Sequence, residues 1–273
     1  MHKSGTIRLG FHAETRHLQF PHEERIVNRD TMLVLNDICW GVPDKPVLRH
    51  VSLTVPDRKC VVVTGPNGGG KTSLAKLIAG IEQPDSGKIL LDGRLINKLS
   101  VTERARSGIA YAFQQPVRFK GLTVRDLMEL AAGQQMDEDA LCETLSKVGL
   151  CAREYIDREV SAGLSGGESK RIEIATVLAR RARLSVFDEP EAGIDLWSFQ
   201  KLIDVFRGLL QETDGSLLII SHQRRILEIA DEIVVIANGQ VSAQGSRDEI
   251  LPLLAAGVEK SCGCPLEGAH PYE

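Results

Sequence analysis

The sequence predicts an α/β fold in which a mostly parallel sheet forms the core, with an antiparallel β layer and an inserted helical part. Helical patterns separate short runs that are apolar throughout, which is typical of a parallel sheet covered on both faces. These runs are residues 60–63, 184–187 and 217–220. Turn signals at Asp92-Gly93 and Asn238-Gly239 predict hairpins near both ends, and the hairpins suggest the antiparallel layer.

The elements follow in order from Met32, where the first regular strand pattern begins. Strand patterns cover residues 32–40, 47–55, 59–65, 87–96 and 232–245. Residues 122–150 are rich in helix formers, and residues 168–182 predict one amphipathic helix. We therefore expect an N-terminal extension over residues 1–31, a main domain over 32–252 and a tail over 253–273. The helical subdomain is expected at about 115–170.

Composition excludes several classes of protein. The chain has 273 residues, of which 42% are apolar and 26% charged, as in soluble globular proteins. A net charge of -4 argues against nucleic acid as a partner. The apolar runs are far shorter than the ~20 residues that span a bilayer, so no direct membrane insertion is expected. A polar N-terminus and four scattered cysteines, interpreted as reduced thiols, predict a cytoplasmic protein.

The stretch GPNGGGKTS fits a phosphate-binding loop, G-x-x-x-x-G-K-[ST], between an apolar strand and a helical pattern. Backbone N–H groups must close around phosphate oxygens, so glycines stand where side chains would obstruct them. The ammonium of Lys71 is expected on the β- and γ-phosphates of ATP, and the hydroxyl of Thr72 on Mg²⁺. The predicted binding residues are Gly65, Pro66, Asn67, Gly68, Gly69, Gly70, Lys71, Thr72 and Ser73.

Two adjacent carboxylates follow a second apolar strand in the stretch VFDEPEAGID. In nucleotide hydrolases with a phosphate loop, an aspartate at such a strand end holds the Mg²⁺ shell, and we assign this role to Asp188. Glu189 is expected to polarise the water that attacks the γ-phosphate. Mg²⁺ and Lys71 make the two neighbouring charges tolerable, since without cations one pKa would rise.

The stretch LSGGESKR predicts a second anion-binding helix start. Ser165 and Glu168 have the spacing of a capping box, so Ser165, Gly166 and Gly167 lie at a helix N-terminus. One nucleotide has little use for two such ends in one subunit. Two subunits arranged head to tail could place each ATP between the phosphate loop of one and the Ser-Gly-Gly of the other. We therefore expect an ATP-dependent homodimer.

Together these motifs resemble those of the ATP-binding-cassette (ABC) ATPases over about residues 32–250. The resemblance implies a P-loop NTPase fold of ABC type, ATP hydrolysis, and Mg²⁺ bound by Thr72, Gln114 and Asp188. It also implies a signature sequence at LSGGE and an adenine-stacking Trp40. Gln114 matches a glutamine that contacts Mg²⁺ and water, and His222 matches a γ-phosphate contact. Residues 192–195 match the D-loop, which ends at Asp195. The spacing favours Gln114 over its neighbour Gln115. The implied catalytic residues are Lys71, Gln114, Glu189 and His222.

Two kinds of partner remain open. The stretches FQQP, SGGESKR and DEPEAGID look similar to a short form of the SufC-type ATPase, which works with a SufB-type scaffold in iron–sulfur cluster assembly. Leu164 and Ser169 depart from the better-known bacterial SufC pattern. The alternative is the ATP-binding subunit of a membrane transporter with separate membrane-spanning subunits, because Val117–Met128 is similar to an importer pattern. Cys262 and Cys264 in the tail are too few for a closed metal site.

Overall fold

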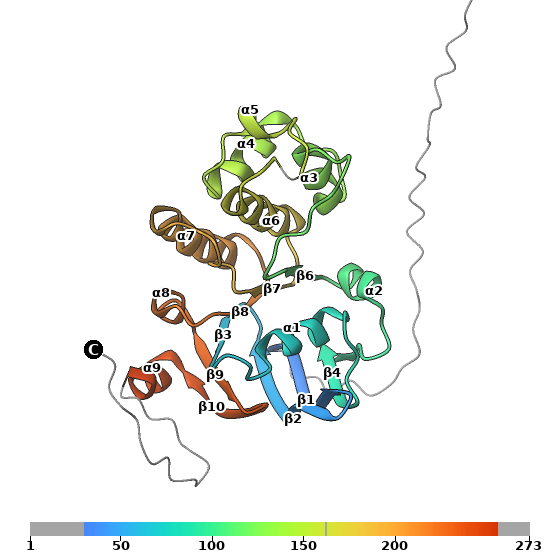
Figure 1. Cartoon of the computed structure of the whole chain (residues 1–273), viewed down its shortest axis with the longest axis vertical. Coiled ribbons are helices and arrows are strands. Elements are labelled where there is room, and N and C mark those ends of the chain that lie inside the picture. The colour runs from blue at the N-terminus through green and yellow to red at the C-terminus, as the bar shows by residue number, and fades with distance from the viewer. Residues whose placement is uncertain (1–29, 162, 256–273) are drawn as a thin grey trace, which may run out of the picture.

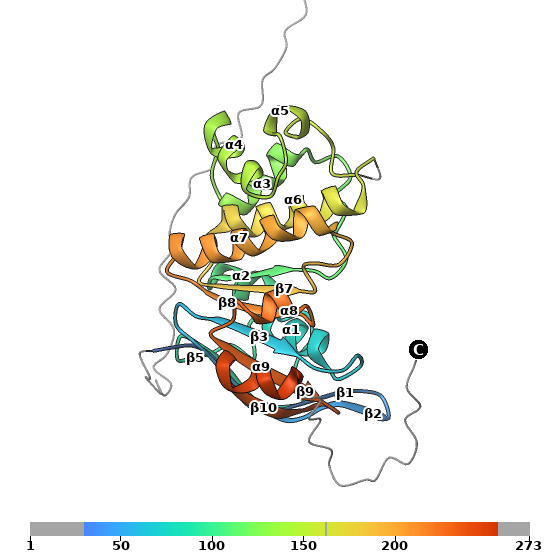
Figure 2. The same ribbon diagram turned by 90° about the vertical axis from the view of Figure 1, so that its left-hand side faces the viewer.

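The computed structural model describes residues 30–161 and 163–255. Within them, two sheets are stacked below a lobe of helices (Figures 1 and 2). Most of the expected N-terminal extension and tail, including Cys262 and Cys264, lies outside the described residues. Within the described residues, no helix combines the length and apolar character that crossing a bilayer requires.

The main sheet has six strands in the order β10-β9-β3-β8-β7-β6, and all but β10 run parallel. Its strands are β3 (Cys60–Thr64), β6 (Ile109–Ala112), β7 (Leu184–Asp188), β8 (Ser216–Ile220), β9 (Glu232–Ala237) and β10 (Gln240–Ser246). Every residue of β3, β7 and β8 is buried, as the apolar runs predict. We expected the C-terminal hairpin to belong to the antiparallel layer. Instead, β10 pairs with β9 and extends the main sheet as an antiparallel edge strand.

The antiparallel layer is a four-stranded sheet in the order β2-β1-β4-β5. It consists of β1 (Thr31–Val42), β2 (Lys45–Pro56), β4 (Ser86–Leu91) and β5 (Arg94–Leu95). Asp92 and Gly93 form the predicted turn between β4 and β5, with φ values of 50° and 72°. Apolar side chains of this layer share one cluster with α1 (Lys71–Ala79) and one face of the main sheet.

The helical lobe is inserted between β6 and β7, which are neighbours in the main sheet. It contains α3 (Val124–Ala132), α4 (Glu138–Lys147), α5 (Ala152–Tyr155) and α6 (Gly166–Arg180). The other helices are α2 (Val101–Arg106), α7 (Leu196–Glu212), α8 (Arg224–Leu227) and α9 (Arg247–Ala255). The α6 helix begins and ends two residues earlier than predicted, because Ser165 caps its start and Arg181 turns left-handed at its end.

Helices cover the other face of the main sheet as well. Buried residues of α3, α4, α6 and α7 form a second cluster with apolar side chains of that face. Apolar material therefore covers both sides of the parallel strands, as the uninterrupted apolar runs require. The carboxyl ends of β3, β7 and β8 carry the loops that contain the predicted site residues. The predicted α/β architecture, with its antiparallel layer and helical insertion, is confirmed.

Candidate active site

The phosphate loop joins β3 to α1, and two of its glycines are required by the close approach of β9. A Cβ atom on Gly65 would lie 2.1 Å from the carbonyl oxygen of Ile236, and one on Gly69 would lie 2.9 Å from it. Gly65 also has a φ of 131°, which only glycine adopts readily. Gly70 caps α1 without a side chain, so the first N–H groups of this helix face the loop and can bind an anion.

Lys71 lies inside the phosphate loop. Its Nζ donates hydrogen bonds of 2.8 Å to the carbonyl oxygens of both Gly65 and Pro66, and its side chain is buried. Burial lowers the pKa of Lys71, while the charges of Glu189 and Asp188 oppose this shift. The ammonium therefore stands between the loop and the two carboxylates, where a polyphosphate would bring compensating negative charge.

The carboxylate of Asp188 is fully buried at the end of β7 and is held from two sides. Thr72 Oγ1 donates to its Oδ1 at 3.2 Å, and the Tyr111 hydroxyl donates to its Oδ2 at 3.2 Å. Burial raises the pKa of Asp188, and the two hydrogen bonds oppose this shift. A carboxylate beside a hydroxyl is a set of oxygen ligands that suits a hard divalent cation such as Mg²⁺.

Glu189 follows directly and turns away from the strand, with a φ of 46°. Its backbone N–H donates to Ile220 O at 3.0 Å, which keeps it beside β8. Of the two neighbouring glutamines, Gln114 is the one whose side chain donates to Glu189, with 2.7 Å between Nε2 and Oε2. Gln114 is exposed and Glu189 half-buried, so water can reach both.

His222 and Asp195 lie on the loops that follow β8 and β7. His222 is exposed two residues after the end of β8, and Ile220 pairs in register with Asp188 at the end of β7. The strand ends therefore place His222 near the paired carboxylates. Asp195 accepts hydrogen bonds from the backbone N–H of Ser198 at 2.9 Å and from its hydroxyl at 2.7 Å, and so caps α7.

Trp40 reaches the phosphate loop through its neighbours on the antiparallel sheet. It is half-buried in β1 and pairs in register with Leu48 of β2. The Leu48 side chain lies so close to Gly70 that a Cβ atom there would be 2.6 Å from Leu48 Cδ2. Trp40 is therefore paired with the strand residue whose side chain packs against the loop, a placement compatible with an aromatic base beside bound phosphates.

The signature sequence forms the second helix start. Ser165 caps α6, and Glu168 completes a reciprocal capping box with it. Glu168 also accepts a hydrogen bond from the Tyr155 hydroxyl, and this contact, together with the Ser165 donors, lowers the pKa of Glu168 to about 2. A Cβ atom on Gly167 would lie 3.4 Å from Gly193 O, so the signature touches the D-loop. Because α6 belongs to the helical lobe and α1 to the core, the two anion-binding ends occupy different lobes (Figures 1 and 2).

Sequence reasoning did not predict the contacts that support these residues. Lys170 is fully buried, and its Nζ donates to the carbonyl oxygens of Phe113 and of Gln114, the latter at 3.3 Å. Glu173 accepts from the Phe113 backbone N–H at 2.8 Å. The α6 helix thereby holds the segment that leads into Gln114. A lysine in the stretch SKR gives no signal for this role, since it resembles an exposed charge on a helix.

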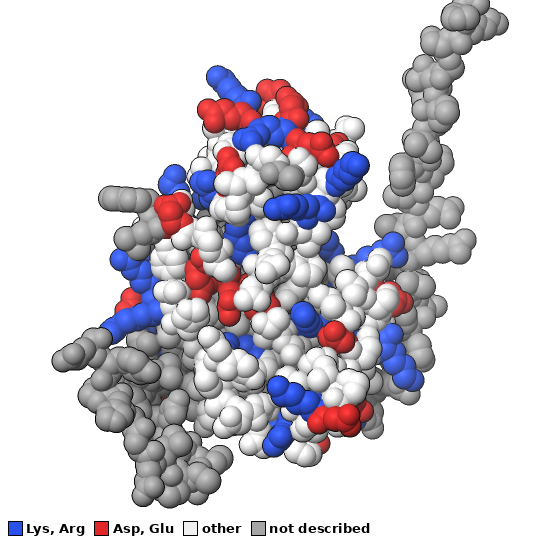
Figure 3. Space-filling view, in the orientation of Figure 1, with Lys and Arg blue, Asp and Glu red and all other residues white. Residues whose placement is uncertain are grey.

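Charged side chains of both signs are mixed on the surface, in keeping with the small net charge of the chain. On the face shown in Figure 3, Lys and Arg side chains are interspersed with Asp and Glu rather than gathered into one basic stripe. A nucleic-acid-binding surface normally concentrates positive charge on one face or along one helix. The face that Figure 3 shows has no such concentration among the described residues.

Comparisons with known proteins agree with this geometry. The family described as "ABC transporter" matches residues 48–192, more than half of the chain. An uncharacterised ABC transporter ATP-binding protein of Methanocaldococcus jannaschii is 36% identical over 240 residues, covering 85% of this chain and 94% of that protein. A sulfate/thiosulfate import ATP-binding protein of Synechocystis is 31% identical over 223 residues, covering 80% of this chain and 61% of that protein.

The fold has a close counterpart among solved structures. The structure of an ATP-binding subunit of an ABC transporter superposes with a TM-score of 0.71 at 26% identity, covering 85% of this chain and 95% of that one. The phosphate loop, the signature helix and the paired carboxylates thus lie within a fold that this chain shares with that subunit. On these grounds the chain belongs to the ABC transporter family and is an ATPase of the ATP-binding-cassette type.

Proposed function

We propose that this chain binds Mg-ATP between two copies of itself and uses hydrolysis to change the shape of a partner protein. The observation that carries this proposal is the presence of two anion-binding helix starts in different lobes of one chain, α1 and α6. Each nucleotide would meet the phosphate loop of one copy and the Ser165–Gly167 signature of the other. Closure of such a dimer on ATP, and its opening after hydrolysis, would supply the movement.

Each predicted site residue has a role in this scheme. Trp40 would stack on adenine, the 65–73 loop and Lys71 would bind the phosphates, and Glu189 would polarise water for attack on the γ-phosphate. His222 would stabilise the γ-phosphate, and Asp195 would act at the edge between the two copies. Thr72, Gln114 and Asp188 would hold Mg²⁺, which supplies positive charge beside the transferred phosphate.

The partner is proposed to dock where the helical lobe meets the core. A cavity of about 230 Å³ opens there, lined mainly by apolar side chains from α1, α2, β6, α3 and α6. Large apolar side chains are exposed beside it or on the segment that follows Gln114. They are Ile81, Val101, Phe113, Val117, Phe119 and Leu130. An exposed apolar group of this kind favours contact with another protein. Its position next to Gln114 would link partner binding to the γ-phosphate.

We infer that the partner is a membrane-spanning transporter subunit. The relatives described above carry the names of transporter and import ATP-binding proteins. The segment Val117–Met128, which is similar to an importer pattern, contributes Val117 and Phe119 to the exposed apolar group. This agreement of names and surface makes the transporter role the better supported of the two open from the sequence.

A SufB-type scaffold is the second candidate. It rests on the stretches FQQP, SGGESKR and DEPEAGID, whose resemblance to the SufC type led us to expect iron–sulfur cluster assembly. None of the relatives described above carries that name. The two partners would use the same ATP chemistry, so only identification of the bound protein separates them.

The test is affinity capture of tagged protein from an anaerobic lysate, before and after detergent extraction of membranes, with mass spectrometry of the bound proteins. A multi-spanning protein recovered only from the detergent extract supports the transporter role. A soluble cysteine-bearing protein that carries iron and acid-labile sulfide supports the scaffold role instead. In either case Leu130→Asp should abolish capture, because it places a charge in the proposed docking surface. Leu254→Asp, at an exposed leucine of α9, serves as the matched control.

A further inference from the structure

The turn after the paired carboxylates contains a third acidic residue that the proposed chemistry does not use. Glu191 is only 8% exposed, and its Oε1 accepts a hydrogen bond of 2.5 Å from the Ser221 hydroxyl. Its Oε2 accepts no hydrogen bond from any described residue. Burial raises the pKa of Glu191, and the Ser221 contact opposes this shift. A buried carboxylate with one unpaired oxygen destabilises a fold, so its presence requires another explanation.

The partner of Glu191 suggests that explanation. Ser221 is fully buried and immediately precedes His222. Its backbone N–H donates to Val63 O at 3.1 Å, and its hydroxyl accepts from the Gln223 N–H at 3.0 Å. The Ser221 hydroxyl thereby links Ser221 and Gln223, the residues on the two sides of His222. The orientation of that hydroxyl depends on Glu191, the side-chain acceptor to which it donates.

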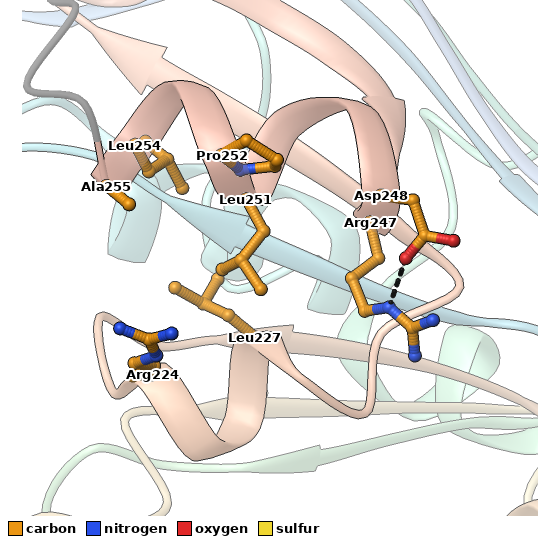
Figure 4. A pocket seen from close by; sticks show the side chains of 8 residues that line it. All are labelled: Arg224, Leu227, Arg247, Asp248, Leu251, Pro252, Leu254 and Ala255. Carbon is orange, nitrogen blue, oxygen red and sulfur yellow. Dashed lines mark hydrogen bonds and ion pairs between the residues drawn. The ribbon is translucent and has the colours of Figure 1, made fainter.

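Two cavities flank the segment that follows His222. On the far side, α8 is anchored by Leu227, which points toward Leu251 of α9 in an apolar cavity (Figure 4). Between the loop and the start of α7, a second cavity of about 640 Å³ is lined by residues that include Glu191 and Gln223. Across that cavity, the Arg225 guanidinium of α8 lies over the Phe199 ring of α7, 6.0 Å from its centroid. The hydrogen bond between Glu191 and Ser221 joins the turn after β7 to the loop itself.

We propose that Glu191 is a positioning residue for His222, acting through Ser221. The contact joins the turn that carries Asp188 and Glu189 to the loop that carries His222, so the two halves of the catalytic group move together. This inference rests on the role proposed above for His222. A one-ångström displacement of a catalytic group can lower a rate by as much as about a hundred-fold, so a loss on the order of ten-fold in kcat is expected when the contact is removed.

The test is a set of mutant cycles on ATP hydrolysis by the full chain. Glu191→Met keeps the length of the side chain and removes the acceptor, and Ser221→Ala removes the donor. Each should lower kcat on the order of ten-fold with little change in the KM for ATP, and the double variant should lose no more than either alone. Glu191→Gln keeps an acceptor oxygen and should restore most of the rate.

The His222→Ala background separates positioning from general damage. If Glu191 acts through His222, then Glu191→Met should cause no further loss in that background. Ser216→Ala is the matched control, since Ser216 is a buried, hydrogen-bonded serine at the opposite end of β8. It should leave kcat unchanged.

Losses that multiply between Glu191→Met and His222→Ala, or a normal kcat in Ser221→Ala, would overturn the inference. If Glu191→Met fails to fold, the kcat of Ser221→Ala still tests the inference. A normal rate in His222→Ala alone would instead refute the role of His222, and with it the proposed catalytic scheme.

Discussion

At the scale of single residues, the most constrained group is the buried carboxylate of Asp188. Hydrogen bonds from Thr72 and Tyr111 oppose the effect of burial on its pKa and hold one oxygen each. The Tyr111 hydroxyl is itself partly buried, and its pKa is raised by burial and by Asp188, so it stays protonated as the donor. The Tyr111 hydrogen bond therefore favours the ionised form of the carboxylate and orients it.

Tyr111→Phe should weaken Mg²⁺ binding to the ATP complex on the order of ten-fold, because it removes a hydrogen bond that orients a metal-binding carboxylate. Isothermal titration of Mg²⁺ into the protein with ATP measures this directly, without reference to turnover. Tyr155→Phe removes a comparable bond, to Glu168 instead, and should leave Mg²⁺ affinity unchanged. Equal affinities in wild type and Tyr111→Phe would argue against the orienting role.

The pKa of Glu168 predicts a dependence of stability on pH. Its folded-state pKa of about 2 lies below the ordinary value of 4.5, so its contribution is fully present above pH 4.5. That contribution should fall as the pH drops from 4.5 towards 2. Urea unfolding of wild type and Glu168→Gln should give a constant difference near neutral pH and a shrinking one below pH 4.5. A difference that grows at low pH would contradict this account.

The sequence predicts a contact when both of its residues lie within one local motif, and it misses contacts between distant residues. The phosphate loop, the capping box at Ser165 and the two hairpin turns are local patterns, and all appear as expected. Tyr111–Asp188 and Ser221–Glu191 join residues 77 and 30 positions apart, and each residue alone looks ordinary. Only the register of the parallel strands brings such pairs together. The edge position of β10 likewise depends on sheet order rather than on its turn.

At the scale of elements, α1 is held at both ends by unusual caps. Its start is left open for phosphate, and its end is closed by the buried guanidinium of Arg104. Arg104 donates to Leu77 O and Ile78 O of the last turn of α1, the latter at 3.2 Å. It also donates to Asn97 O at 3.0 Å and to Leu99 O at 3.1 Å. One side chain thus ties α1 to the loop before α2.

Arg104→Met should lower the free energy of unfolding by about 3 kcal/mol or more, because it leaves several buried carbonyl groups without donors. Arg106→Ala changes an exposed arginine on the same helix and should alter stability by less than about 0.5 kcal/mol. Urea denaturation of the two variants provides the comparison. Similar midpoints for both would mean that Arg104 does not support α1.

The α6 helix connects the signature to the segment that holds Gln114. Lys170→Met should release the Phe113 and Gln114 carbonyls and so lower kcat, with little change in the KM for ATP. Faster amide exchange at residues 113–115 should accompany the loss, since these residues would no longer be held against α6. Exchange at wild-type rates would show that the contact does not control this segment.

At the scale of the whole molecule, the phosphate loop and the signature lie in different lobes, although the proposed site needs both of them for one nucleotide. The core carries the phosphate loop and both carboxylates, and the helical lobe carries the signature and the exposed Leu130. In the proposed dimer, such a chain would complete its site only against a second copy. In the same proposal, the segment around Phe113 would transmit the state of that site to the partner protein docked at the cavity beside it.

The ATP-bound mass of Glu189→Gln tests this account most directly. The substitution keeps nucleotide contacts and slows hydrolysis, so the closed state should accumulate. With Mg-ATP, light scattering should give twice the 29.9 kDa mass of the chain, with ATP co-eluting, and adding Lys71→Ala should return it to a monomer. A Glu189→Gln protein that binds ATP yet remains a 29.9 kDa monomer would contradict the shared site.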